Sequence, residues 1–70
     1  MTKREKERVE NLKKDMVFHK KRSEYPPIEF NALPEYKRRM ADLDYGYAMG
    51  IYEVLSALGC VDEYPDFDKI

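Results

Sequence analysis

Residues 36–57 read YKRRMADLDYGYAMGIYEVLSA, and their hydrophobic pattern is the most informative in the chain. Large apolar and small residues recur there at alternating steps of four and three, at Tyr36, Met40, Leu43, Tyr47, Gly50, Val54 and Ala57. This heptad spacing is typical of a helix that packs lengthwise against another helix. A second series, Ala41, Tyr45, Ala48, Tyr52 and Leu55, runs beside the first. Ile51 and Leu58 fill most of the remaining gap, so the helix between Tyr45 and Leu58 is predicted to be apolar nearly all round, and therefore buried.

The ends of this second helix are indicated by turn-forming residues. Asn31 can cap its start, and Pro34 is tolerated only in a first turn. No helix-breaking residue follows before Gly59, which suits the left-handed position after a helix. We therefore assign residues 32–59 to the long apolar helix and its stop, with the helical part ending at about Leu58.

Residues 1–24 form a second predicted unit, a basic charged helix. Thr2 and Glu5 have the spacing of a capping box, in which each residue satisfies a backbone N–H of the other. Helix-favouring residues then continue to Arg22, with a narrow seam at Val9, Leu12, Met16 and His19. The first two turns carry no apolar residue, so we expect them to project into solvent.

Residues 25–31 are the predicted linker between these helices. Because a residue before proline avoids helical dihedral angles, Pro26 and Pro27 favour an extended chain over Tyr25–Phe30. The expected fold is therefore all-α: a two-helix hairpin with a proline-containing linker. Residues 60–70 form an acidic aromatic tail in which Pro65 prevents a regular helix, and the tail either packs on the body or binds a partner.

Charge is divided unevenly along the chain, although the net charge is only −1. Residues 1–24 carry nine basic and five acidic groups, which gives +4, and residues 25–70 carry four basic and nine acidic groups, which gives −5. Such a division indicates either a charged partner or attraction between the two parts.

Self-association or binding to a partner is the expected source of further burial. A compact chain of 70 residues buries only enough apolar area to balance its conformational entropy, and a two-helix hairpin is less compact. Gly46 and Gly50 lie four residues apart and would allow close approach of another helix. We expect Tyr45 and Tyr52 at the interface between copies, and Tyr47 in ordinary core packing. The predicted self-association residues are Met40, Leu43, Tyr45, Gly46, Tyr47, Gly50, Tyr52 and Val54.

These features favour a non-catalytic protein that works by binding another macromolecule, as an adaptor or inhibitor. The predicted partner-binding residues are Lys13, Lys14, Lys20, Lys21, Arg22, Asp62, Glu63, Tyr64 and Phe67. The alternative is a nucleic-acid-binding module that uses the basic first helix, although its interspersed acids and the acidic remainder oppose phosphate binding. In length and in its Lys/Glu/Tyr-rich composition the chain is similar to small accessory proteins of bacteriophages and mobile elements, a likeness that carries no diagnostic motif.

Other classes of function have little support in the sequence. The single His19 and the single Cys60 match no familiar metal-ligand spacing and no nucleophile–base pair, so we expect neither a cofactor nor an enzyme. No run of about 20 apolar residues predicts a membrane span. The absence of an apolar segment behind a basic N-terminus, together with the single cysteine, favours the cytoplasm.

Overall fold

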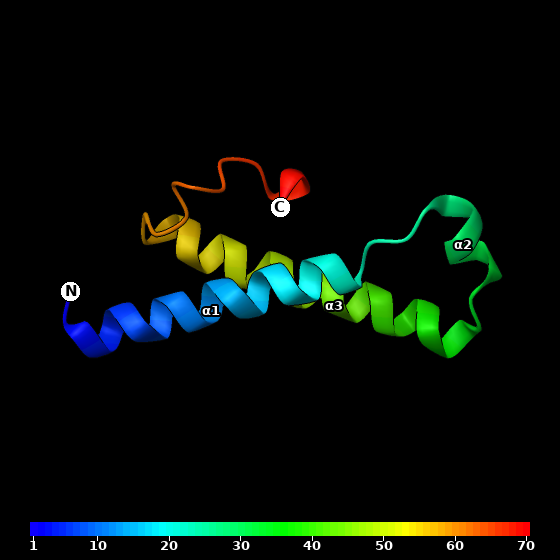
Figure 1. Cartoon of the computed structure of the whole chain (residues 1–70), viewed down its shortest axis with the longest axis horizontal. Helices are drawn as coiled ribbons and strands as arrows, with labels where there is room; N and C mark the ends of the chain where they lie inside the picture. Colours follow the sequence, from blue (N-terminus) through cyan, green and yellow to red (C-terminus); the bar gives the residue numbers. More distant parts are fainter.

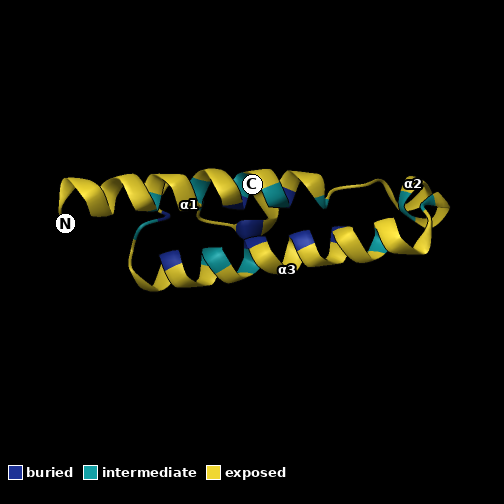
Figure 2. Ribbon diagram, turned by 90° about the horizontal axis from the view of Figure 1, so that it is seen from below, coloured by how far each residue is buried: buried dark blue, intermediate teal, exposed yellow.

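The computed structural model describes all residues from 1 to 70 and is helical throughout its regular structure. It contains α1 (Lys3–Arg22), α2 (Pro27–Ala32), α3 (Glu35–Ala57) and a 3-10 helix, η1 (Phe67–Lys69). Figures 1 and 2 show α1 and α3 side by side and running in opposite directions, with α2 at the turn between them. The molecule is elongated, with extents of 45 × 20 × 14 Å. The prediction of an all-α chain is confirmed.

The N-terminal cap of α1 forms much as the sequence predicts. The Thr2 hydroxyl oxygen accepts a hydrogen bond from the backbone N–H of Glu5 at 3.1 Å. The reciprocal contact differs from a full capping box, because the Thr2 hydroxyl donates to the Glu5 carboxylate, also at 3.1 Å. Four basic residues, His19 to Arg22, occupy the last turn, where positive charge is favourable next to the free carbonyl groups of the helix.

The linker differs from the extended chain expected over Tyr25–Phe30. Pro26 is extended, with ψ 146°, but Pro27 begins the six-residue helix α2. Pro27 is accommodated because the first position of a helix needs no backbone donor. The N–H of Phe30 donates to the carbonyl of Pro26 at 2.9 Å and closes this short turn. Proline therefore starts a helix here instead of preventing one.

The second long helix also begins later than predicted, at Glu35 instead of near Asn31. Leu33 precedes Pro34 and is extended, with ψ 147°. This is the backbone conformation that a following proline imposes, and it separates α2 from α3. Asn31 consequently lies inside α2, and Pro34 stands at the cap position of α3.

Gly59 ends α3 as predicted. Its φ of +69° is in the left-handed region, and no other residue of the chain has a positive φ. The N–H of Cys60 donates to the carbonyl of Leu55 at 2.8 Å, and that of Gly59 donates to Ser56 at 3.0 Å. These two bonds are the Schellman arrangement, which satisfies carbonyl groups at the helix end.

The core between the two long helices uses only one of the two apolar series of α3. Ala48 and Leu55 of the second series are fully buried against Met16 of α1, and Val61 and Phe67 of the tail complete the cluster. By contrast, every member of the heptad series is exposed. The expectation that α3 is buried nearly all round is therefore wrong for the single chain, because α1 and the tail cover only part of its circumference.

The buried face of α1 is also rotated from the predicted seam. Val9 and Met16 face the core, but Leu12 is 38% exposed. Lys13 and Lys20 occupy the neighbouring inward positions, and Lys20 is buried. Long lysine stems can cover apolar surface while their ammonium groups reach polar partners at its edge, so these lysines substitute for apolar residues.

Gly59→Ala is predicted to destabilise the chain by about 1 kcal/mol, because a side chain disfavours the left-handed backbone. An added Cβ would meet no atom within 4 Å, so the cost would come from the backbone alone. Gly46→Ala is the matched control: its Cβ also meets nothing, yet it lies within α3 and should stabilise the helix. Urea unfolding measures both changes, and equal effects of the two substitutions would contradict this account.

Candidate interaction surface

The two-helix layer has two broad faces, and the C-terminal tail covers one of them. Figure 1 shows the tail returning over α1 and α3 after Gly59. The Phe67 ring packs on Tyr52 and Tyr45, with ring centroids 5.3 and 5.4 Å apart respectively. The Tyr52 hydroxyl donates to the backbone carbonyl of Tyr64 at 2.8 Å. Aromatic contacts and a hydrogen bond to the main chain therefore hold the tail in place.

Lys20 joins this aromatic cluster from α1. Only 5% of the residue is exposed, and its ammonium nitrogen lies 5.4 Å from the centre of the Phe67 ring and 5.9 Å from that of Tyr45. The same nitrogen donates to the carboxylate of Glu24 at 2.9 Å. A cation over two ring faces with one carboxylate partner satisfies a charge that burial would otherwise penalise.

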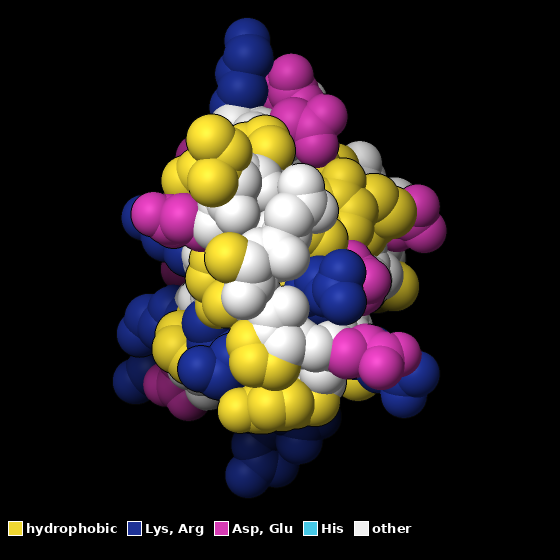
Figure 3. Space-filling view, turned by 90° about the vertical axis from the view of Figure 1, so that its right-hand side faces the viewer, with side chains coloured by type: hydrophobic (Ala, Val, Ile, Leu, Met, Phe, Trp, Pro, Cys, Tyr) yellow, Lys and Arg dark blue, Asp and Glu magenta, His cyan; other side chains and the backbone are white.

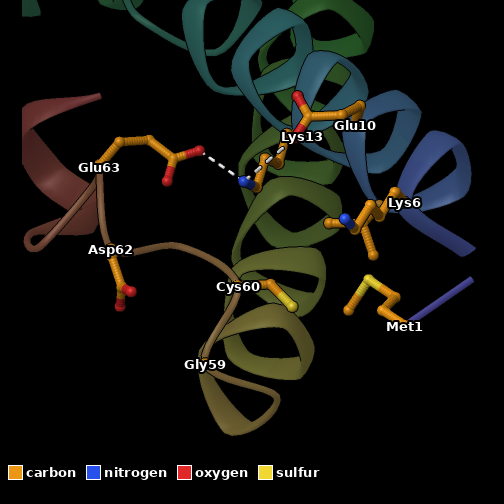
Figure 4. A pocket seen from close by; sticks show the side chains of 9 residues that line it. Met1, Lys6, Glu10, Lys13, Gly59, Cys60, Asp62 and Glu63 are labelled. Atoms are coloured by element: carbon orange, nitrogen blue, oxygen red, sulfur yellow. Dashed lines mark hydrogen bonds and ion pairs between the residues drawn. The ribbon is translucent and has the colours of Figure 1, made fainter. Parts of the chain in front are cut away.

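A second contact of the tail is the ion pair between Lys13 and Glu63. The Lys13 nitrogen lies 2.6 Å from a Glu63 oxygen and 3.4 Å from Glu10. Figure 4 shows this pair at the edge of a shallow pocket between α1 and the segment that follows α3. The hydrogen bond from Lys13 lowers the pKa of the Glu63 carboxyl, and the same bond raises the pKa of the Lys13 ammonium group. Both shifts favour the charged pair.

Asp44 organises a polar junction between α1 and α3. It is buried, and one carboxylate oxygen lies 2.7 Å from Nδ1 of His19. Its other oxygen accepts from Nε of Arg22 at 3.2 Å. The His19 ring packs on Tyr47, with centroids 4.5 Å apart. The polar junction therefore supports Tyr47 from beneath and leaves its outer side to solvent.

The face opposite the tail is bare and apolar. Figure 2 is seen from this side and shows α1 and α3 with the tail behind them. Tyr36, Leu43, Tyr47 and Val54 are 53–72% exposed, although their spacing is that of a helix-packing seam. We call the exposed heptad series the bare stripe; its members are Tyr36, Met40, Leu43, Tyr47, Gly50, Val54 and Ala57. An exposed apolar stripe of this kind is a candidate interaction surface.

Exposed apolar side chains also gather at the end of the molecule formed by α2. Figure 3 looks onto this end and shows hydrophobic groups between basic and acidic ones. Ile28 of α2 is 85% exposed there. A nearby pocket is lined by Arg22, Tyr25, Tyr36, Lys37, Met40, Ala41 and Asp44, so it adjoins the first members of the bare stripe.

The structure divides the predicted self-association residues between the two faces. Met40, Leu43, Tyr47, Gly50 and Val54 belong to the bare stripe, and Gly46 is exposed beside it. Tyr45 and Tyr52 lie instead under the tail. The two tyrosines expected between copies thus pack against the tail of their own chain, because the tail covers that side of α3. Tyr47, expected in the core, lies on the uncovered side and is half exposed.

Several of the predicted partner-binding residues contact each other, which is the attraction between the two parts that was one of the two alternatives predicted from the sequence. Lys13 pairs with Glu63, and Lys20 contacts Phe67, so the basic helix and the acidic aromatic tail bind each other. Tyr64 is half-buried, whereas Lys14, Lys21, Arg22 and Asp62 are exposed. The junction at Asp44 was not predicted from the sequence. The available signal was its position beside the buried series, three residues after Ala41 and four before Ala48.

The structure offers few features beyond these surfaces. No group of three or more His, Cys, Asp or Glu side chains is placed to hold a metal ion. Neither long helix has a stretch apolar and uncharged enough to cross a bilayer. No known protein family, curated protein or solved structure matches this chain. The surfaces themselves therefore carry the functional argument.

The Lys13–Glu63 pair predicts a specific acid sensitivity. Because the pKa of Glu63 is lowered from 4.5 by folding, its carboxylate stabilises the fold above that pH, and this contribution is lost as the pH falls through the lowered pKa. The raised pKa of Lys13 acts at the other end, where its contribution is lost as the pH rises through that value. Thermal unfolding midpoints of Glu63→Gln should therefore fall less steeply in acid than those of the unsubstituted chain.

The exposed neighbour Asp62 provides the control for this measurement. Asp62→Asn should retain the acid dependence of the unsubstituted chain, because that carboxylate has no ion-pair partner within the chain. Identical acid profiles for Glu63→Gln and the unsubstituted chain would contradict the role given to the pair.

Phe67 is predicted to be the anchor of the tail. Phe67→Ala removes a ring that is 9% exposed and should destabilise the chain by about 3–5 kcal/mol. Ile28→Ala removes an 85% exposed side chain and should change stability by no more than about 0.5 kcal/mol. Chemical unfolding of the two variants measures the difference, and a small effect at Phe67 would show that the tail is not part of the cooperative core.

Proposed function

We propose that this protein is a small non-catalytic interaction protein whose first partner is a second copy of itself. Two chains would pair through their bare stripes, so that four long helices form one bundle-like body. The assembled body would then bind another macromolecule as an adaptor or inhibitor. The observation that carries the proposal is the bare stripe, a heptad seam that the fold leaves uncovered.

The shape and surface of the chain support pairing. A compact protein of 8.4 kDa exposes about 4,600 Å², whereas this chain exposes 5406 Å². The excess of about 800 Å² is also about the area that a standard protein interface removes from each partner. The radius of gyration is 13.8 Å, against about 11 Å for a compact chain of this length. Each chain is a layer two helices wide, and pairing along the stripe would stack two such layers into a body as thick as an ordinary domain.

Surfaces for a further partner would remain outside the proposed dimer. The first turns of α1 are exposed, as are Lys14 and Lys21 on its outer side. In the tail, Asp62 is exposed and Glu63 is half exposed. A partner with both basic and acidic groups would match these surfaces better than one of a single charge sign.

The alternative, nucleic-acid binding through the basic helix, has weaker support. Lys13, Lys20 and Arg22 already contact the carboxylates of Glu63, Glu24 and Asp44. Phosphate groups would have to compete with these carboxylates. We therefore propose recognition of a protein rather than of a nucleic acid.

Substitution of Leu43 tests the proposal. Leu43 is 72% exposed in the single chain, so Leu43→Arg should leave the fold intact. In a dimer it would bury two charges in an apolar seam and should weaken association at least tenfold, or about 1.4 kcal/mol. Sedimentation velocity over a concentration series measures the association, and circular dichroism checks the helix content.

Ile28→Arg is the matched control, since Ile28 is 85% exposed and lies on α2 away from the stripe. It should associate as the unsubstituted chain does. A folded monomer of 8.4 kDa at all concentrations would refute the proposal. Equal weakening by both substitutions would show that the dimer uses more than the stripe.

A further inference from the structure

We infer that the two copies pair through antiparallel α3 helices, with the two-fold axis between Tyr47 and Gly50. The inference rests on the proposed self-association and adds the orientation and register of the interface. It follows from the gradient of side-chain size along the bare stripe and from the basic charge at the start of α3. Both would be matched in an antiparallel pair and mismatched in a parallel one.

The size gradient divides the stripe into halves. Its first half consists of large side chains, Tyr36, Met40, Leu43 and Tyr47, and its second half of smaller ones, Gly50, Val54 and Ala57. A well-packed interface sets large side chains opposite small ones. Since the large half precedes the small half in each chain, only opposite helix directions set one against the other from Met40 to Ala57.

The heptad spacing gives the register. The stripe alternates between the two core positions of the heptad, and an antiparallel pair sets one kind of core position opposite the other kind. With the two-fold axis between Tyr47 and Gly50, this places Tyr47 opposite Gly50 of the second copy, Leu43 opposite Val54, and Met40 opposite Ala57. The space at Gly50 is open, because a Cβ built there meets no atom within 4 Å. A Tyr47 ring from the second copy can therefore lie directly against the backbone at Gly50.

A parallel pair has the opposite consequence. It would set Gly50 against Gly50 and Ala57 against Ala57, while Tyr36, Met40, Leu43 and Tyr47 would each meet its own counterpart. The helices would be held apart by the large side chains at one end, and voids would remain at the other. Such an interface cannot be filled evenly along its length.

Charge favours the same orientation. Residues 35–39 at the start of α3 have a net charge of +2. In the antiparallel register, Lys37 to Arg39 lie level with the end of α3 of the second copy, which is the negative end of its helix dipole. A parallel pair would set the two basic ends against each other. Complementary charge therefore adds orientation to an interface held by apolar contact.

Disulfide trapping tests the orientation in the full chain. The natural Cys60 is first changed, Cys60→Ser, so that only introduced thiols react. Three variants are then oxidised: Met40→Cys, Ala57→Cys, and the two substitutions together. Both positions are exposed in the single chain, so the fold should tolerate each change.

The antiparallel register predicts covalent dimers from the double variant and not from either single variant. Met40 and Ala57 of one chain are about 25 Å apart along α3, so they cannot bridge within the chain. In the antiparallel pair, position 40 of one chain lies opposite position 57 of the second copy. Position 40 of one chain and position 40 of the second copy are again about 25 Å apart. Non-reducing electrophoresis should therefore show at least a tenfold excess of covalent dimer for the double variant.

The remaining outcomes separate the two proposals. Covalent dimers from both single variants would show a parallel pair, which overturns the orientation and leaves self-association standing. Dimers in sedimentation that no variant can trap would show that another face pairs, which overturns the register and the use of the stripe. A monomer in sedimentation would remove the proposed function itself.

Discussion

The contact on which the rest of the structure depends is the packing of Ala48 and Leu55 of α3 on Met16 of α1. The alanines of one series of α3 face α1, so the other apolar series of α3 points away from α1. A layer only two helices thick then has two faces to cover, and the chain has one short tail with which to cover them. The bare stripe is the direct result of that geometry.

Charge serves the fold at the boundary between these parts. The excess of basic residues before the linker and of acidic residues after it looks like a feature for partners. In the folded chain the two signs meet in Lys13–Glu63 and in Arg22–Asp44, whereas Lys20 contacts the Phe67 ring of the tail. Some of the apparent binding charge is therefore used internally, and the exposed remainder is mixed in sign.

Tyrosines under the tail and tyrosines on the bare stripe have different surroundings. The Tyr52 hydroxyl donates a hydrogen bond to the main chain of the tail, and its ring is partly buried, as is typical of a tyrosine at the edge of a core. Tyr47 rests on His19, with its outer side exposed, which is what an interface tyrosine offers. The two residues are five positions apart. At 3.6 residues per turn this separates them by about 140° around the helix axis, so the two rings face different sides of α3.

Local signals in the sequence determined the helical class, the cap at Thr2 and the stop at Gly59, because backbone hydrogen bonding and dihedral limits act over only a few residues. They also revealed both apolar series of α3. Only the tertiary structure decided which series faces α1, that lysines fill two inward positions of α1, and that the tail lies on Lys20, Tyr45 and Tyr52. Two apolar series on one helix are equivalent until a partner helix packs on one of them, and that selection depends on the shapes of both helices and of the tail together.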